Sequence, residues 1–303
     1  MEMAIRTQGL SKTFGRTRAL ISLDLAVAPG EVIGYLGPNG AGKTTTLRLL
    51  LGLIRATAGR AEIFGTDCQE DPVAVHQRVA YVPGEVNLWP SLTGEETLHL
   101  LGRIQGNVDE AYRDELIERF GFDRSKKVRT YSKGNRQKLI VIAGLMSRAD
   151  LLLLDEPTSG LDPLMERVFR DCVREARERG QTVFLSSHIL AEVEAVCDRI
   201  AILRAGRLVE IGTLAEMRHL SALQVDATLD GSVPDLSRVP GVSAVQVEGN
   251  RLRCRVVGSM EPLVAALAQA NVRHLVSTEP SLEELFLAYY GDESGPGADP
   301  DGS

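Results

Sequence analysis

The segment GPNGAGKT, residues 37–44, constrains the fold of this chain more than any other segment. It matches the pattern G-x-x-x-x-G-K-[S/T], follows an apolar run at residues 32–36 and precedes an amphipathic run at residues 45–54. Glycines let such a loop wrap so that backbone N–H groups and a helix N-terminus face an anionic phosphate chain. The residues expected around the phosphates are Gly37, Pro38, Asn39, Gly40, Ala41, Gly42, Lys43, Thr44 and Thr45. In this loop Lys43 adds a charge at the β and γ phosphates, and Thr44 offers a hydroxyl to Mg²⁺.

Apolar runs alternate with amphipathic runs over the first two thirds of the chain. Residues 151–154 and 182–186 have the pattern of buried strands, and residues 164–179 and 189–196 that of the helices after them. Strand followed by helix, repeated, predicts an α/β fold with a parallel sheet. Between these units, residues 95–120 have helical spacing and no strand pattern, which predicts a helical insertion. Residues 200–203 and 207–211 predict a hairpin at the far edge of the sheet.

The run LLLLDEP, residues 151–157, places two acidic side chains where a buried strand should end. Ligands bind at the carboxyl ends of the strands in a parallel sheet. We therefore expect Asp155 to reach the Mg²⁺ shell and Glu156 to lie beside the γ-phosphate, where it polarises an attacking water. The alternative is that both acids cap a helix.

Further motifs occur in a fixed order around these two. YSKGNRQ, residues 131–137, opens an apolar helix; SGLD, residues 159–162, follows the acidic pair, and His188 follows the next strand. This ordered set resembles the nucleotide-binding subunits of ATP-binding cassette (ABC) transporters over residues 1 to about 215. The fold class implied is the P-loop NTPase sheet with a helical subdomain.

The resemblance implies ATP and Mg²⁺ as cofactors and assigns roles to further residues. Ser132 and Gly134 would serve the γ-phosphate bound by a second cassette, most simply a second copy of this chain, and Asp162 would contact that cassette's phosphate loop. His188 would act as the switch histidine at the γ-phosphate, and Phe14 would stack on adenine. From the residues alone, an aromatic such as Phe14 is more often a core residue, and a histidine such as His188 is more often a cap or surface residue. An ordinary helix N-cap is the alternative for Ser132.

The chain departs from the family pattern at two places. The signature reads SKGN instead of SGGQ, which keeps the hydroxyl of Ser132 and the glycine at Gly134. At residues 81–84, YVPG has Gly84 where the family usually has a glutamine that contacts Mg²⁺ and water. Glu85, one residue on, is the candidate substitute, and this departure leaves a non-hydrolysing regulatory module as an alternative.

Composition and charge exclude several classes of protein. The formal net charge is −7, from 34 Lys plus Arg and 41 Asp plus Glu, and no basic stretch predicts nucleic-acid binding. No run approaches the ~20 apolar residues of a membrane-spanning helix, and the N-terminus lacks a secretory signal. The four cysteines form no metal-binding or disulfide pattern and are expected to be small buried hydrophobes. We expect a cytoplasmic protein, peripheral on the inner face of the cell membrane.

The sequence predicts three regions. Residues 1–220 form the ATP-binding domain, with a helical subdomain at about residues 85–145. Residues 221–290 alternate apolar and polar positions and contain a helix at 262–270, which predicts a small α+β domain. This domain is expected to end in a helix capped by Ser281, and the acidic tail at 291–303 is expected to be disordered.

The expected activity is ATP hydrolysis that drives a separate integral membrane permease. The segment PSLEELFLAYYG, residues 280–291, is similar to the end of bacterial drug- and antibiotic-exporter cassettes, which favours export. Leu88 and Trp89, at the entrance of the helical insertion, are expected to line the permease contact; burial in the subdomain is the alternative. A soluble cassette that acts on ribosomes or DNA is a further alternative, although such relatives usually carry two cassettes or additional insertions.

Overall fold

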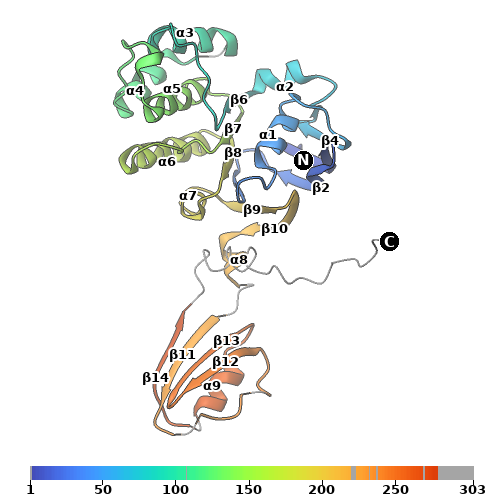
Figure 1. Ribbon diagram of the computed structural model, residues 1–303, viewed down its shortest axis with the longest axis vertical. Helices are drawn as coiled ribbons and strands as arrows, with labels where there is room; N and C mark the ends of the chain where they lie inside the picture. The colour runs from blue at the N-terminus through green and yellow to red at the C-terminus, as the bar shows by residue number, and fades with distance from the viewer. Residues whose placement is uncertain are drawn as a thin grey trace. The chain divides into compact units, whose positions relative to one another are not determined.

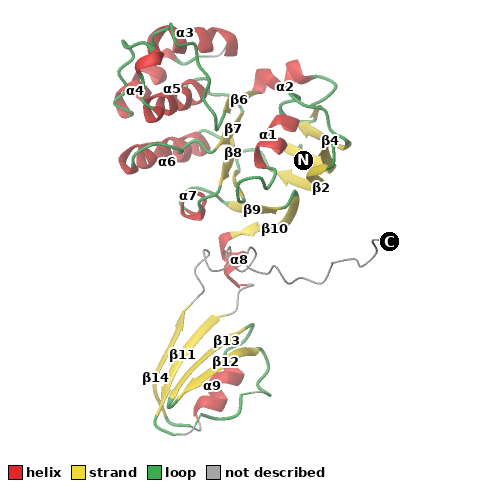
Figure 2. Cartoon of the chain, in the orientation of Figure 1, coloured by secondary structure: helices red, strands yellow, loops and turns green. Residues whose placement is uncertain are grey.

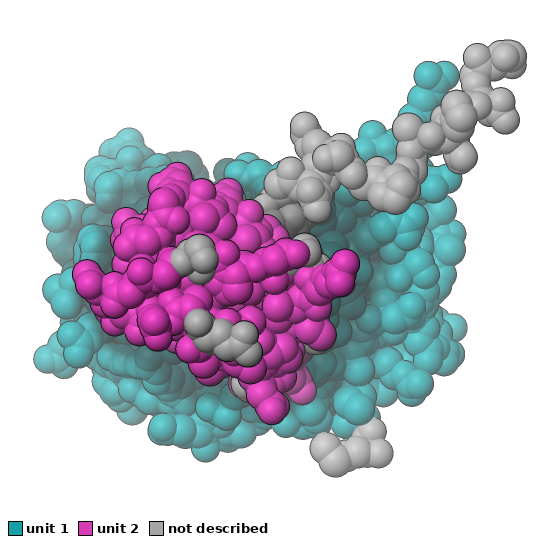
Figure 3. Space-filling model, turned by 90° about the horizontal axis from the view of Figure 1, so that it is seen from below, with its two compact units in different colours: residues 1–211 teal, residues 212–303 magenta. Residues whose placement is uncertain are grey.

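The computed structural model divides the chain into two compact units, residues 1–211 and 212–303 (Figures 1 and 3). It describes residues 2–106, 108–219, 223–231, 233–236, 238–268 and 270–278. The division falls at Ile211/Gly212, whereas the sequence placed the domain boundary at 220. The helix expected at Ser281 and the tail 291–303 lie outside the described residues.

A six-stranded sheet forms the centre of the first unit, with the strand order β10-β9-β3-β8-β7-β6. The prediction of a parallel sheet is confirmed, because β3 pairs in parallel with β8 and β9, and β7 pairs in parallel with β6 and β8. Every residue of β3, β7 and β8 is buried, as expected for strands covered on both faces. The strands are β3 (Val32–Leu36), β6 (Val79–Val82), β7 (Leu151–Asp155), β8 (Thr182–Ser187), β9 (Arg199–Arg204) and β10 (Arg207–Thr213).

Helices follow the strands of this sheet where the sequence predicted them. They are α1 (Lys43–Leu50) after β3, α6 (Pro163–Glu178) after β7 and α7 (Leu190–Glu194) after β8. The helix α2 (Pro72–Arg78) precedes β6. In Figure 2 the helices α1 and α6 lie on opposite sides of strands β7 and β8. This arrangement leaves the carboxyl ends of β3, β7 and β8 together at one edge.

A second, antiparallel sheet in this unit was not predicted from the sequence. Its order is β2-β1-β4-β5, built from β1 (Ile5–Phe14), β2 (Thr17–Val27), β4 (Ala58–Ile63) and β5 (Thr66–Asp67). The pairing of β1 with β2 shifts register at three points, so the alternation of apolar and polar residues is interrupted. Its buried side chains share one core with α1 and the parallel sheet. The sheet therefore covers the face of α1 that does not contact the parallel strands.

The predicted helical insertion is present. It consists of α3 (Gly94–Gln105), α4 (Glu110–Arg119), the 3-10 turn η1 (Val128–Thr130) and α5 (Lys133–Leu145). A capping box starts α3, in which Thr93 and Glu96 each accept a hydrogen bond from the other's backbone N–H. The helix α5 is buried along most of its length, and both α3 and α4 pack against it. Its N-terminal end carries the signature segment.

The second unit contains a four-stranded antiparallel sheet of order β12-β13-β11-β14. Its elements are α8 (Leu214–His219), β11 (Leu223–Leu229), β12 (Val242–Glu248), β13 (Arg251–Val256), α9 (Glu261–Ala268) and β14 (Val272–Thr278). Alternate residues of β11 and β13 share a core with Leu263 and Leu267 of α9. The α+β pattern read from the sequence is present in the described residues of this unit.

All four cysteines are buried and free, as the sequence predicted. Burial raises the pKa of Cys68 and of Cys172 to about 12, and it also raises the pKa of Cys197 and Cys254. We therefore expect thiol reagents at pH 8 to modify the native chain at least about a hundredfold more slowly than the unfolded chain, because little thiolate forms and access is blocked. Colour release from a disulfide reagent measures this, with chain in guanidinium as the control. Prompt reaction of one full equivalent in the native chain would contradict it.

Candidate functional site

The phosphate loop lies between the end of β3 and the start of α1. Gly42 takes a left-handed conformation with φ of +110° at the N-cap of α1. A Cβ at this position would come within 2.4 Å of the backbone oxygen of Ala19, so only glycine fits. The first N–H groups of α1 are therefore open at the loop, where the helix dipole favours negative charge.

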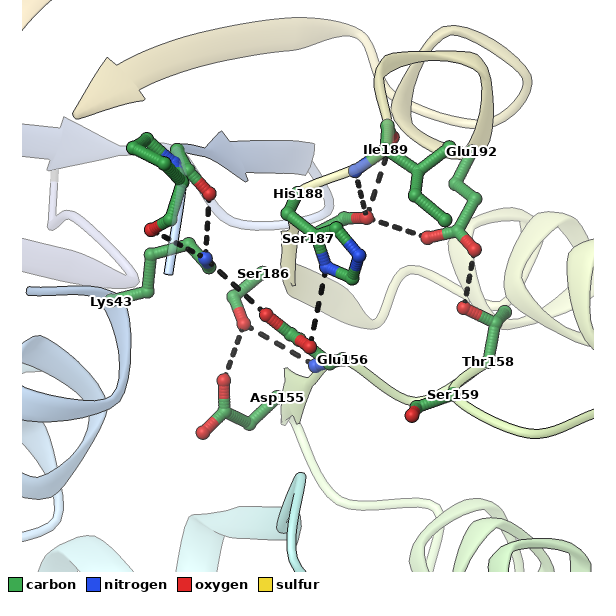
Figure 4. A network of polar contacts seen from close by, with 12 residues as sticks. Lys43, Asp155, Glu156, Thr158, Ser159, Ser186, Ser187, His188, Ile189 and Glu192 are labelled. Carbon is green, nitrogen blue, oxygen red and sulfur yellow. Dashed lines mark hydrogen bonds and ion pairs between the residues drawn. The ribbon is translucent and has the colours of Figure 1, made fainter. Parts of the chain in front are cut away.

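Lys43 is nearly fully buried, with 5% of its side chain exposed. Its Nζ donates hydrogen bonds to the backbone oxygens of Gly37, at 2.6 Å, and Pro38, at 3.2 Å. The same nitrogen lies 3.3 Å from Oε1 of Glu156 (Figure 4). A buried ammonium group with several acceptors is thus held inside the loop.

Asp155, the last residue of β7, is buried and accepts two hydrogen bonds. Thr44 Oγ1 donates to Oδ2 at 2.8 Å, and Ser186 Oγ donates to Oδ1 at 2.5 Å. The acid therefore joins the start of α1 to the end of β8. Burial, followed by the negative charge of Asp155, raises the pKa of Tyr81 on β6 to about 12, so that phenol stays protonated. The alternative interpretation of Asp155 as a helix cap is wrong.

Glu156 lies between two basic side chains at the carboxyl edge of the sheet. Its Oε1 is 3.3 Å from Lys43 Nζ, and its Oε2 is 3.3 Å from Nδ1 of His188 (Figure 4). Its backbone has a φ of +47°, which is rare for a residue with a side chain, and its N–H donates to the backbone oxygen of Ser186 at 3.1 Å. Such conformations cost about 1–3 kcal/mol and concentrate at functional sites.

The signature residues lie at the head of α5. Ser132 is the N-cap and accepts a hydrogen bond from the N–H of Asn135, so the capping role is present. A Cβ at Gly134 would come within 2.7 Å of the backbone oxygen of Gly160, so α5 packs directly on the turn after Glu156. Lys133 Nζ donates to Ser159 Oγ at 3.2 Å in the same turn. In Figure 1 α5 and α1 lie on opposite sides of strands β6–β8.

The remaining sequence candidates are exposed. Asp162 is the N-cap of α6 and accepts a hydrogen bond from the N–H of Met165. Phe14, at the end of β1, is 49% exposed, which contradicts the alternative of a core residue, and Lys12 Nζ lies 4.8 Å from its ring centroid. Glu85 is exposed in the loop after β6.

Gly84 lies directly against the acidic end of β7. A Cβ there would be 3.2 Å from the backbone oxygen of Asp155 and 3.6 Å from its Cγ. The position at which the family has a glutamine is thus adjacent to Asp155. Because this residue is Gly84, no side chain is present there. The role of Glu85 stays a prediction.

Ser186 was part of a predicted strand, but no role was assigned to it from the sequence. The signal was present, because a hydroxyl residue ends an otherwise apolar strand. Its meaning depended on β8 being the neighbour of β7, which places Ser186 opposite Asp155 in the sheet register.

Among the described residues, no helix is long and apolar enough to cross a membrane. In the same part of the chain, no group of three or more His, Cys, Asp or Glu side chains has the arrangement of a metal site.

Comparison with known proteins adds independent evidence. The family model described as ABC transporter matches residues 20–159. The chain is 37% identical over 308 residues to the daunorubicin resistance ATP-binding protein DrrA3 of Streptomyces coeruleorubidus, covering 96% of this chain and 97% of that protein. It is 30% identical over 306 residues to the linearmycin resistance ATP-binding protein LnrL of Bacillus subtilis, covering 95% and 98%.

Solved structures support the same fold. The ATP-binding subunit of an ABC transporter is 31% identical, with a TM-score of 0.66, and the match covers 71% of this chain and 92% of that subunit. An ATP-binding cassette solved as a dimer with ADP and Pi matches with a TM-score of 0.63 at 22% identity, which shows the shared fold. The order of motifs, the geometry at the end of β7 and these relatives agree: the chain belongs to the ABC transporter family and is an ATP-binding, ATP-hydrolysing subunit of such a transporter.

Proposed function

We propose that this subunit binds Mg-ATP at the carboxyl edge of the parallel sheet, dimerises on it, and hydrolyses it to drive an export permease. The observation that carries the proposal is the position of Glu156, held 3.3 Å from both Lys43 and His188 beside the phosphate loop. A carboxylate there is placed to act on a water that attacks the terminal phosphate. The positive charge of Lys43 and the imidazole of His188, on either side of Glu156, are placed to interact with the phosphate's negative charge.

The phosphate loop supplies the binding groups for the nucleotide. Residues 37–45 present backbone N–H groups and the N-terminus of α1, and Lys43 adds a point charge for the β and γ phosphates. Phe14 offers a half-exposed aromatic ring at the end of β1 for stacking on adenine. Both groups belong to the first unit.

The donor set at the end of β7 fits Mg²⁺. Thr44 and Asp155 place a hydroxyl and a carboxylate oxygen 2.8 Å apart, and hard cations of this kind prefer oxygen ligands. A magnesium ion held there with ATP supplies charge neutralisation on the phosphate oxygens. Thr44 and Asp155 then orient the phosphate end, and Glu85, one residue beyond the backbone that touches Asp155, supplies a further carboxylate.

Two chains complete the site in this proposal. Ser132, Gly134 and Asp162 lie at the ends of α5 and α6, and Ser132 and Asp162 are exposed. The helix α5 and the phosphate loop occupy different sides of the same sheet, so the signature of one chain serves ATP held by a second copy (Figure 1). His188 senses the γ-phosphate next to Glu156.

The membrane partner is inferred from an exposed aromatic side chain and from the relatives. Trp89 is 47% exposed in the segment between β6 and α3, which contradicts the alternative of burial for this residue, whereas Leu88 is half-buried. Exposed tryptophan is a common anchor of protein interfaces. Two relatives that match nearly the whole chain are named for resistance to daunorubicin and to linearmycin. We therefore assign a separate permease, an export direction, and a place on the inner face of the cell membrane.

Replacing Lys43 with Met should lower the affinity for ATP at least about tenfold, because a buried charge that faces the phosphates is removed. Titration of a fluorescent ATP analogue measures this. Lys126→Met is the control, because Lys126 is an exposed lysine paired with Asp123. Equal affinity in both variants would remove Lys43 from the phosphate site.

Replacing Glu156 with Gln should leave ATP binding intact and lower the turnover number at least about a hundredfold, because the amide does not accept the proton of the attacking water. Phosphate release at saturating Mg-ATP measures turnover, and gel filtration with ATP measures dimer formation. Substantial turnover in this variant would contradict the role of Glu156 as the base.

Tagged Glu156→Gln chain, purified from native membranes in mild detergent with Mg-ATP, should retain a multi-span membrane protein. Adding Trp89→Ala should lower the recovery of that partner several-fold, because an interface anchor is lost. Mass spectrometry identifies and quantifies the partner, and Val73→Ala, at an exposed apolar residue of α2, is the control. Recovery of ribosomes or of the chain alone would contradict the transporter assembly, and equal recovery with Trp89→Ala would contradict the anchor.

A further inference from the structure

Glu192, on α7, belongs to a polar network that the mechanism above does not use. Its carboxylate accepts a hydrogen bond from Thr158 Oγ1 at 2.6 Å and another from Ser187 Oγ at 2.5 Å (Figure 4). Short O–H···O⁻ hydrogen bonds of this kind are charge-assisted and strong. Both hydroxyl residues are buried, with 6% and 1% of their surface exposed, so water competes little for these bonds.

One end of this network lies at the two residues that flank His188, the proposed switch histidine. Ser187 Oγ, besides donating to Glu192, accepts a hydrogen bond from the backbone N–H of Ile189 at 2.9 Å. Ser187 and Ile189 are the residues on either side of His188. The single hydroxyl of Ser187 therefore joins both neighbours of His188 to the carboxylate of Glu192.

The other end of the network holds the turn that follows Glu156, the proposed catalytic base. Thr158 comes two residues after Glu156, and the N–H of Ser159 donates to the backbone oxygen of Glu156 at 3.1 Å. The same turn accepts a hydrogen bond at Pro157 from Gln137 of α5 at 2.8 Å. A displacement of Thr158 would therefore move the backbone of Glu156.

The sheet itself does not set the distance between Glu156 and His188. The ladder between β7 and β8 ends at the pair Asp155 and Ser186; Ser187 still pairs with Leu36 of β3, whereas Glu156 lies beyond the end of β7. Beyond that pair the N–H of Glu156 still bonds to Ser186, while the side chain of Glu192 connects Thr158 to Ser187. Its two oxygen atoms connect the two segments just beyond the last β7–β8 pair.

We propose that Glu192 is a positioning residue for hydrolysis, because its bonds to Thr158 and Ser187 hold Glu156 and His188 at the spacing that the reaction needs. This inference rests on the proposed roles of Glu156 and His188. Glu192 acts through Thr158 and Ser187 and does not touch the nucleotide. Its loss affects the turnover number and leaves the binding of ATP to the phosphate loop unchanged.

The test compares matched variants of the full chain in ATP hydrolysis and ATP binding. Glu192→Ala and Thr158→Val should each lower kcat about tenfold to a hundredfold, the range expected when a reacting group is misplaced by about 1 Å. The KM and the dissociation constant for ATP should stay within about twofold of the values for the unaltered chain, because the contacts that bind ATP before the reaction are unchanged. Thr158→Ser, which keeps the hydroxyl, should recover most of the lost kcat.

Coupling between the two residues separates positioning from general destabilisation. In the double variant Glu192→Ala/Thr158→Val, the loss in kcat should be no larger than in Glu192→Ala alone, because both substitutions break the same link. Glu166→Gln is the matched control: Glu166 is an acid of α6 that lines the same small cavity as Glu192, and its kcat should be unchanged. Additive losses, unchanged kcat in Glu192→Ala, or a failure of Thr158→Ser to recover activity would overturn the proposal.

The Glu156→Gln variant distinguishes failure of this inference from failure of the proposed function. If Glu156→Gln abolishes turnover and Glu192→Ala does not reduce it, only the positioning role is wrong. If Glu156→Gln retains turnover, the assignment of the base is wrong and the positioning role is overturned with it. An increase in the KM for ATP that accounts for the loss in Glu192→Ala would assign Glu192 to binding and would also overturn the proposal.

Discussion

Parallel pairing of β3, β8 and β7 is the constraint on which the rest of the site depends. In a parallel sheet the carboxyl ends of adjacent strands meet at one edge, and the register here places Leu36 opposite Ser187 and Ser186 opposite Asp155. The phosphate loop follows β3, Asp155 and Glu156 lie at the end of β7, and His188 follows β8. Segments more than a hundred residues apart in the sequence are thereby brought within hydrogen-bonding distance.

The two acidic side chains at this edge each have polar partners. Asp155 accepts hydrogen bonds from two hydroxyl groups, and Glu156 lies between Lys43 and His188. A buried carboxylate such as that of Asp155 is stable only when such partners satisfy it. Each acid is therefore oriented by groups from α1 and from the end of β8 or the residue after it, and the edge is organised by the protein's own contacts.

The helical subdomain is mechanically connected to this edge. Gln137 of α5 donates to the backbone of Pro157, Lys133 donates to Ser159, and the close approach at Gly134 excludes any side chain. The turn after Glu156 is thus held by α5 on one side and by Glu192 on the other. A movement of α5 would therefore be transmitted to the backbone of Glu156 through direct contacts.

The sequence by itself determined the phosphate loop, the alternation of strands and helices, the acidic pair and the family. These features depend on local spacing and on apolar runs followed by polar residues. It did not reveal the antiparallel sheet, because bulges in β1 break the alternation that marks a strand. Nor did it reveal Ser186, Thr158 or Glu192, which are ordinary residues until β7 and β8 are neighbours. Whether Phe14 and Trp89 are core or surface was also decided by the tertiary structure, because burial depends on what packs over a residue. The motifs are local in sequence, while the partners that orient them come from strand pairing between distant segments, and only the folded chain contains that information.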